Sequence, residues 1–238
     1  HVGGRTQIDV TWFHADSQVE SDPSLGFPLR DGVNFRRARL RVDGTMYETI
    51  DWAAEYDFVN AAQVLSSPTG TPNPIDVPAP TDLWFHFKEV PWVGNIRVGN
   101  HKEPIGFEHI VSSLNLPYLE RSFNQDAFYG AFNNGFTPGI SIFDNWLEDR
   151  GTWTLGLFKP TTNPFASNNT PGDSSVTGRI TFLPWYRDEG ASLLHLGVSA
   201  RHATLADGFV RFRARGPERS GLSSVRPLYA DTGRLFGE

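Results

Sequence analysis

Hydrophobic and polar residues alternate with a period of two along most of this chain. The segment 34–46 shows the pattern most clearly, because its odd positions are mainly basic or polar and its even positions mainly aliphatic. A strand sends successive side chains to opposite faces, whereas a helix would scatter these arginines around its circumference. The alternation therefore predicts a two-faced β-strand. Further segments alternate in the same way at residues 6–13, 51–58, 82–90, 94–102, 138–144, 151–159, 176–182, 192–201 and 209–215.

The connections between these segments alternate strictly in length. The tight ones lie at 47–50, 90–93, 147–151 and 187–190, and the long ones at 16–32, 61–80, 102–136, 161–173 and after 202. In an up-and-down meander this order places all tight turns at one end and all long loops at the other. Transmembrane β-barrels have that asymmetry, whereas the Greek-key crossings of a soluble sandwich mix the lengths.

All seven tryptophans fall near the ends of the predicted strands or beside the tight turns. Amphipathic rings favour the two water–lipid boundaries of a membrane, where outer-membrane barrels carry aromatic girdles. Ordinary core or edge packing of aromatic rings is the alternative, and it requires no membrane. The tryptophans are Trp12, Trp52, Trp84, Trp92, Trp146, Trp153 and Trp185.

Composition and charge narrow the class of protein further. The 238 residues include no cysteine, which excludes a disulfide framework and a thiolate metal site. The formal net charge of -6 argues against a general nucleic-acid binder. The chain also lacks a run of about 18 apolar residues, the length that predicts a membrane-spanning helix. It starts at His1 with no signal-peptide hydrophobic region, so we expect it to begin after processing or within a longer protein.

Residues 102–136 form a connection that is too long for a plain loop and contains no clean strand. Loops of this length are usually functional or disordered, and the many aromatic residues here favour order. In a barrel such a segment can fold into the lumen and narrow it. We therefore expect Lys102 and Arg121 to lie at a constriction.

Several stretches together resemble the phosphate-selective porin O and P family of Gram-negative outer membranes. They are FRRARLRVDG at 35–44, KEPIG at 102–106, LERS at 119–122, TPGI at 137–140 and the stretch 212–233. No single motif is very specific, but their order and spacing cover most of the chain. The resemblance implies a trimeric, roughly sixteen-stranded barrel with an inward-folded third external loop and an arginine-lined pore.

The predicted architecture is all-β: an antiparallel up-and-down transmembrane β-barrel of which residues 1–238 supply about ten strands. The chain ends RLFGE without the usual closing strand, so we expect a single porin domain that lacks its C-terminal strands. Alone it would expose two open sheet edges to lipid, where backbone groups cannot remain unsatisfied. The resemblance implies a homotrimer in contact with lipid in the outer membrane of a Gram-negative-type bacterium.

Arginines on the predicted inward face are the candidate pore-lining residues. Guanidinium groups can replace the water that a small anion such as phosphate loses on entering a narrow pore. Rings of positive side chains select anions, and weak sites in series allow both entry and exit. The candidates are Arg37, Arg39, Arg41, Arg97, Arg179 and Arg201, joined by Lys102 and Arg121 of the constriction loop.

The same arginines also have an ordinary structural interpretation. If the turn after 34–46 centres near Glu48, Arg41 lies opposite Glu55 and Arg39 lies opposite Asp57. Such cross-strand ion pairs would stiffen the wall and neutralise much of the arginine row.

Three functions remain open from the sequence. The chain is an outer-membrane porin that passes small anions by passive diffusion, a general porin whose wall is neutralised, or a secreted β-sandwich that binds anionic glycans. The GxSxG and HExxH motifs and the phosphate-cradling glycine-rich loop do not occur. We therefore expect no catalytic residues, no cofactor and no metal site.

Overall fold

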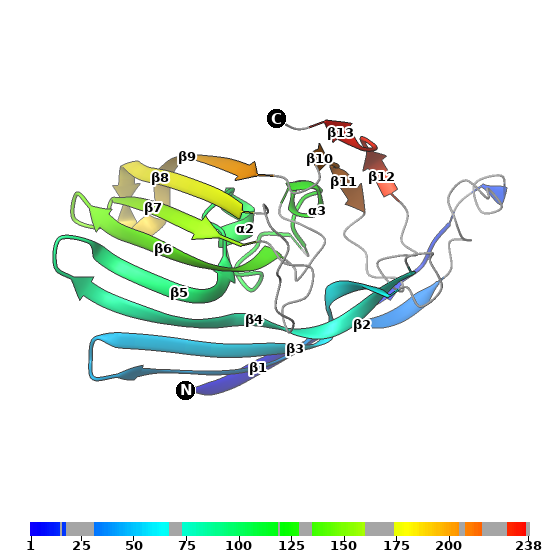
Figure 1. The fold of residues 1–238 in the computed structure, drawn as a ribbon, viewed down its shortest axis with the longest axis horizontal. Helices are drawn as coiled ribbons and strands as arrows, with labels where there is room; N and C mark the ends of the chain where they lie inside the picture. The colour runs from blue at the N-terminus through cyan, green and yellow to red at the C-terminus, as the bar shows by residue number, and fades with distance from the viewer. Residues whose placement is uncertain are drawn as a thin grey trace.

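The computed structural model of this chain describes residues 1–14, 16–17, 31–66, 73–118, 120–128, 135–159, 174–204, 208–215 and 228–236. Nine strands form one antiparallel sheet in which each strand pairs with its neighbours along the chain (Figure 1). This up-and-down meander confirms the predicted architecture. The strands are β1 Val2–Thr11, β2 Gly32–Met46, β3 Ile50–Ser66, β4 Asn73–Val90, β5 Gly94–Lys102, β6 Phe136–Trp146, β7 Gly151–Phe158, β8 Ser174–Arg187 and β9 Ser192–Thr204.

Tight turns join β2 to β3, β4 to β5, β6 to β7 and β8 to β9, as predicted. All four lie at the left-hand end of the sheet in Figure 1. Their backbones enter the left-handed region, for example at Tyr47 (φ 51°), Glu48 (φ 62°) and Trp92 (φ 68°). Left-handed residues in tight hairpin turns match the right-handed twist of the flanking strands. The turns therefore keep neighbouring strands in register along the sheet.

The long loop predicted at residues 61–80 is wrong for most of its length. β3 continues to Ser66, β4 begins at Asn73, and the two strands stay paired to those ends. Prolines interrupt the alternation in this stretch, and proline is tolerated in a strand at a bulge. The pairing is irregular between Asp57 and Ala62, opposite Pro78, which is how the hairpin accommodates it.

The last predicted strand, residues 209–215, does not join the main sheet. It divides into β10 Phe209–Val210 and β11 Arg213–Arg215. These pair with β13 Leu235–Phe236 and β12 Leu228–Asp231, respectively. Period-two alternation over seven residues identified extended backbone here, but it did not identify the partner strands.

A bulge in β2 changes which side chains face inward. Strict alternation places Phe35 on the same face as Arg37 and places Arg36 on the other. The pairing of β1 with β2 shifts between Gln7 and Ile8, so Gln7 pairs with Arg37 and Ile8 pairs with Phe35. Phe35 is consequently 53% exposed, whereas Arg36 is only 6% exposed. The inner face gains an arginine that the alternation assigned to the outer face.

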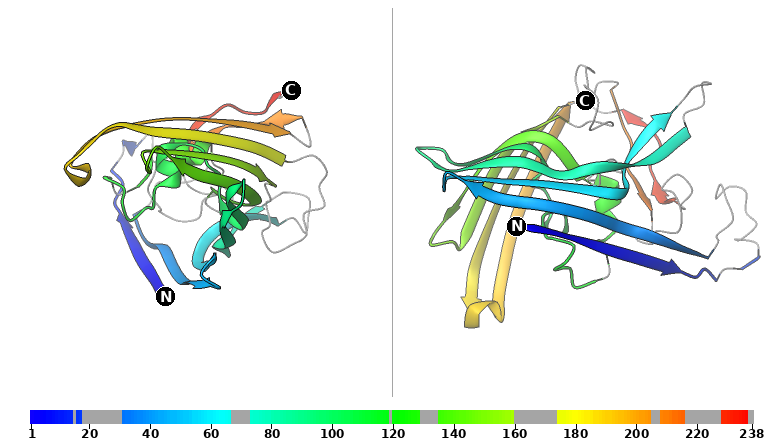
Figure 2. Two further views of the ribbon diagram at one scale, coloured as in Figure 1. Left: turned by 90° about the vertical axis from the view of Figure 1, so that its left-hand side faces the viewer. Right: turned by 90° about the horizontal axis from the view of Figure 1, so that it is seen from below.

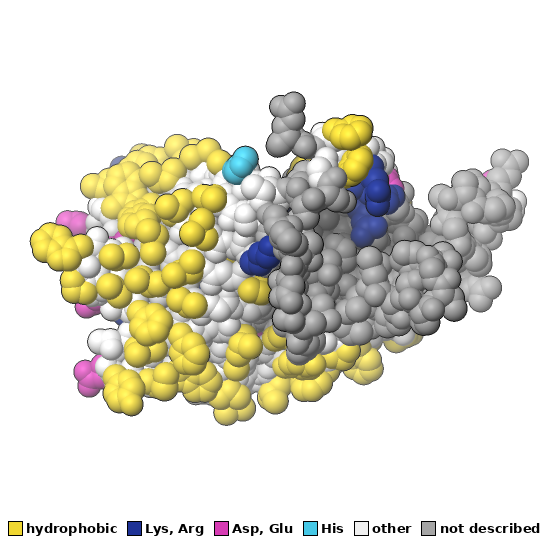
Figure 3. Space-filling view, viewed as in Figure 1, with side chains coloured by type: hydrophobic (Ala, Val, Ile, Leu, Met, Phe, Trp, Pro, Cys, Tyr) yellow, Lys and Arg dark blue, Asp and Glu magenta, His cyan; other side chains and the backbone are white. Residues whose placement is uncertain are grey.

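The sheet is polar on its concave side and apolar on its outer side. Among the described residues, five hydrophobic residues are buried against fourteen polar or charged ones, the reverse of a soluble core. Outward side chains such as Leu83, Ile180 and Val198 are 52%, 47% and 66% exposed. Figure 3 shows hydrophobic side chains spread over this face of the sheet. An apolar outer band around a polar interior is typical of a transmembrane barrel.

The described residues 103–118, 120–128 and 135, which we call the inward segment, fold onto the concave face. Figure 2 shows the sheet curving as an arc that is open between β1 and β9, with this segment inside the curve. It contains two short helices, α2 Phe107–Ile110 and α3 Asn124–Phe128. The predicted inward-folded third external loop is confirmed. No helix in the described part of the chain is long and apolar enough to cross a membrane.

Candidate functional site

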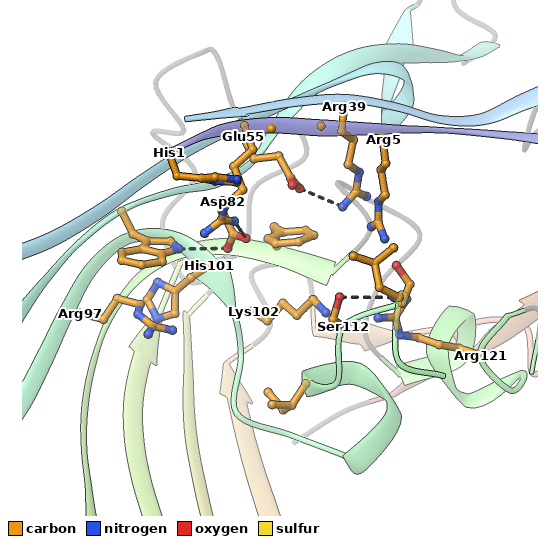
Figure 4. Close-up of a pocket in the computed structure, with 18 residues that line it drawn as sticks. His1, Arg5, Arg39, Glu55, Asp82, Arg97, His101, Lys102, Ser112 and Arg121 are labelled. Carbon is orange, nitrogen blue, oxygen red and sulfur yellow. Dashed lines mark hydrogen bonds and ion pairs between the residues drawn. The ribbon is translucent and has the colours of Figure 1, made fainter. Parts of the chain in front are cut away.

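A hollow of about 520 Å³ lies between the inward segment and the strands β1 to β6 (Figure 4). We call it the loop–wall pocket. Its lining includes six cationic side chains and two carboxylates. Three of the cations also pair with acids outside the lining. The cations are Arg5, Arg39, Arg41, Arg97, Lys102 and Arg121, and the carboxylates are Glu55 and Asp82.

Arg39 is held by two carboxylates of the neighbouring strand. It lies directly opposite Asp57 in the pairing of β2 with β3. Its Nε donates to Asp57 Oδ2 at 2.7 Å, and its Nη1 donates to Glu55 Oε1 at 2.9 Å. The remaining Nη2 is buried and has no hydrogen-bond partner among the described residues. The predicted cross-strand ion pair is therefore confirmed, and it compensates much of this arginine's charge.

Arg41 makes different pairs from those its strand position suggests. The register places it opposite Glu55, as predicted. Its Nε nevertheless donates to Asp43 at 2.8 Å and its Nη1 donates to Asp82 at 2.9 Å. Arg41 bridges two acids on the rim of the pocket, and it is more exposed than Arg39, with a side-chain exposure of 29% against 5%.

Arg97 of β5 contacts two aromatic rings. Its guanidinium lies 4.4 Å from the ring centre of Trp84 and 5.1 Å from that of Phe143. Within the described part of the chain it forms no ion pair, and its buried Nε has no hydrogen-bond partner. Aromatic faces attract a cation but do not cancel its charge.

Lys102 and Arg121 meet at the backbone of the inward segment. Lys102 Nζ donates to the carbonyl of His109 at 2.7 Å and to that of Val111 at 3.4 Å. Arg121 donates to the carbonyls of Glu108 and Val111, both at 2.7 Å. Carbonyl oxygens satisfy these donors without carrying a net charge. Arg121 also pairs with Glu120 at 3.5 Å, whereas Lys102 forms no ion pair with a described residue.

Arg37 does not line the loop–wall pocket. Its Nη2 donates to Glu120 of the inward segment at 2.7 Å, and its Nη1 donates to Gln7 of β1 at 2.7 Å. Arg36 donates to the same Glu120 oxygen at 2.6 Å and also pairs with Asp9. Both arginines therefore act within a buried ion-pair cluster at the β1–β2 wall.

Arg179 and Arg201 lie on β8 and β9, apart from the other candidates, at the start of the inward segment. Arg179 donates to the carbonyl of Gly106 at 2.7 Å. Arg201 pairs with Glu103 at 3.0 Å. The predicted single row of arginines is thus divided by the inward segment. One group lies at β2 and β5, and the other fastens the segment to β8 and β9.

Arg5 of β1 is a pocket residue that the sequence analysis missed. It pairs in register with Arg39, which places two like charges side by side on the wall. Among the described residues Arg5 forms no ion pair. The predicted strand began at Thr6, four residues after the start of β1 at Val2, and so left out Arg5, which continues the inward alternation of Gln7 and Asp9.

Glu120 and His109 of the inward segment have strongly displaced pKa values. Burial raises the pKa of the Glu120 carboxyl, but the charges of Arg37 and Arg36 outweigh it and lower the pKa to about 2. Burial lowers the pKa of His109 to about 3, and the charge of Lys102 acts in the same direction. At neutral pH, Glu120 is therefore charged and His109 is neutral. No group of three or more potential metal ligands occurs in the described ranges.

Comparison with known proteins places these features in one family. The family model described as phosphate-selective porin O and P matches residues 1–216, which include all nine strands of the sheet and the inward segment. No curated protein matches the chain.

Proposed function

Because this chain belongs to the phosphate-selective porin O and P family, we propose that it passes small anions such as phosphate through the loop–wall pocket by passive diffusion. Family membership indicates a channel of the Gram-negative outer membrane rather than an enzyme. The proposal adds the selectivity of this channel for anions and the residues that provide this selectivity.

The observation that carries the proposal is the group of uncompensated cations in the loop–wall pocket. Arg5, Arg97 and Lys102 form no ion pair with any described residue. Arg121 gives its two shortest hydrogen bonds to backbone carbonyls and pairs with Glu120 at 3.5 Å. Figure 4 shows Arg5 and Arg39 projecting from the strands on one side of the pocket, with Lys102 and Arg121 opposite. A small anion between them would meet positive charge from two sides.

An anion in this pocket exchanges water for hydrogen bonds from the protein. Guanidinium groups donate in a planar fork that matches phosphate, and ammonium groups add a compact point charge. Several moderate sites allow an ion to leave as well as to enter. We assign this role to Arg5, Arg97, Lys102 and Arg121, with Arg39 and Arg41 contributing those donors that their acids leave unused.

A general porin with a neutralised wall is the second candidate, and one observation favours it. Arg37, Arg39, Arg41 and Arg201 all lie in ion pairs with wall or loop carboxylates. Of the predicted pore-lining arginines, these contribute little net charge to the passage. Selectivity then depends on the remaining cations, so substitutions at those positions separate the two functions.

The outer apolar face supports a membrane setting for this channel. In the described part of the chain no second sheet covers that face, which disfavours the β-sandwich alternative. We propose that lipid covers the exposed rows and that the channel assembles as a homotrimer, as the family resemblance implies. We also propose that residues 1–238 belong to a single porin domain.

Reversal potentials in planar bilayers test the proposal. Under a KCl gradient the wild-type channel is expected to prefer chloride over potassium. Arg5→Ala should lower that permeability ratio about fivefold, because one unit charge near an ion in a water-filled passage is worth about 1 kcal/mol. The matched control is Arg187→Ala, since Arg187 lies at a tight turn against Trp185 and away from the pocket. Equal ratios in all three proteins would support the general porin instead.

A further inference from the structure

Two of the attachments between the inward segment and the sheet are each centred on one carboxylate. At its start, Glu103 accepts hydrogen bonds from Thr177 at 2.9 Å and Ser175 at 3.3 Å of β8, and it pairs with Arg201 of β9. In its middle, Glu120 accepts from Arg36 and Arg37 of β2. The segment therefore crosses the lumen from the β8–β9 wall to the β1–β2 wall.

The attachment at Glu120 is a buried cluster of charges. The side-chain exposures of Glu120, Arg36 and Arg37 are 9%, 7% and 3%. Asp9 of β1 completes the cluster through Arg36, and Arg121 extends it on the segment. Arg36 and Arg37 donate to the same carboxylate oxygen of Glu120. Glu120 thereby bonds the inward segment to the β1–β2 wall.

We infer that Glu120 is a positioning residue of the channel, which holds the inward segment against β2 and so sets the width of the passage. Its charge has a second effect, because it balances Arg36 and Arg37 and leaves the attraction of anions to the loop–wall pocket. The effect on selectivity rests on the proposed function, whereas the effect on the width of the passage does not.

The loss of this one charge has a calculable effect on the attachment. Arg36 would keep its pair with Asp9, whereas Arg37 would lose its carboxylate. A buried charge left without its partner shifts an equilibrium by about a hundredfold or more. Here the equilibrium lies between an attached and a detached segment. A detached segment widens the passage, so it should appear as openings to a larger conductance level.

Single-channel recordings of Glu120→Gln in the full chain test the inference. We expect openings to a larger conductance level about a hundredfold more often than in wild type. Glu120→Asp keeps the charge on a shorter side chain that reaches Arg36 and Arg37 less well, so its openings should be intermediate in frequency between those of wild type and Glu120→Gln. The matched control is Glu108→Gln, because among the described residues the Glu108 carboxylate accepts hydrogen bonds only from Ser122 of the same segment, at 2.8 and 2.6 Å. Its recordings should resemble those of wild type.

A second measurement covers the case in which Glu120→Gln fails to fold. The chain has no cysteine, so Ser112→Cys on the inward segment provides a unique thiol. Its reactivity with a water-soluble thiol reagent should rise in the Glu120→Asp background but not in the Glu108→Gln background. The inference is overturned if the Glu120 and Glu108 variants give the same conductance levels and the same reactivity. A wild-type channel without anion preference would refute the proposed function but leave this comparison valid.

Discussion

Two arginines on one strand, Arg39 and Arg41, should differ sharply in what they contribute to stability. The Arg39 side chain is 5% exposed and its partner Asp57 is 3% exposed. Arg39→Ala therefore leaves a buried carboxylate without its cation, and breaking a buried pair in this way costs about 3–5 kcal/mol. Arg41 and its partner Asp82 are 29% and 25% exposed, so solvent screens their pairing. We expect Arg41→Ala to cost about 1 kcal/mol or less.

Urea unfolding of the reconstituted proteins, followed by tryptophan fluorescence, measures both losses. The double variant Arg39→Ala with Asp57→Asn should recover part of the stability, because it removes the uncompensated charge as well. The stability that the double variant recovers measures the effect of the ion pair, because both variants lose the packing of the Arg39 side chain. Equal losses at Arg39 and Arg41, or no recovery in the double variant, would refute the reasoning from burial.

Two further predictions concern pH and backbone strain. The pKa of His109 is lowered to about 3 from an ordinary 6.5, so the folded segment favours the neutral imidazole. The stability of the attachment should therefore fall as the pH drops from about 6.5 towards 3. Conductance noise should increase over this pH range in the wild-type channel. In His109→Gln the noise should not depend on pH over the same range. Gly99 has φ +132°, and an added Cβ would lie 2.2 Å from the backbone oxygen of Leu83, so Gly99→Ala should destabilise the sheet by about 1–3 kcal/mol. Gly178→Ala, whose Cβ would meet nothing closer than 3.8 Å, is the control, and equal unfolding midpoints for the two variants would contradict the prediction.

Glu120 should add a second, lower step to the pH dependence. Its depressed pKa means that its contribution is present above about 4.5 and is lost as pH falls towards 2. The groups that face it are Asp9, Arg36, Arg37 and Arg121. The steps of His109 and Glu120 thus occupy different parts of the pH range and can be separated by single substitutions.

The sheet could be predicted from the sequence because its determinants are local. Side-chain period and turn position fix which residues face each other, so the register that opposes Arg39 to Asp57 followed from the tight turn near Glu48. The outward rows followed from the same alternation. A bulge cannot be predicted in this way. One extra residue at Arg36 exchanges the inward and outward positions of β2, and the pattern of hydrophobic and polar residues does not indicate it.

The contacts of the site could not be predicted in the same way. Glu120 meets Arg36 across 84 residues of sequence, and no period or spacing relates the two. The inward folding of the segment was expected, but the walls that it touches were not. Arg97 illustrates a further limit, because its predicted inward direction was right while its stacking on Trp84 and Phe143 depends on the curvature of the sheet.

Competition between phosphate and chloride in a single channel tests the central claim most directly. If anions bind the cations of the loop–wall pocket, added inorganic phosphate should reduce the chloride current along a saturable curve. The curve should shift to higher phosphate concentration in Arg5→Ala. A current that simply increases in proportion to added salt, with no saturation in wild type, would contradict a binding site for anions in this passage.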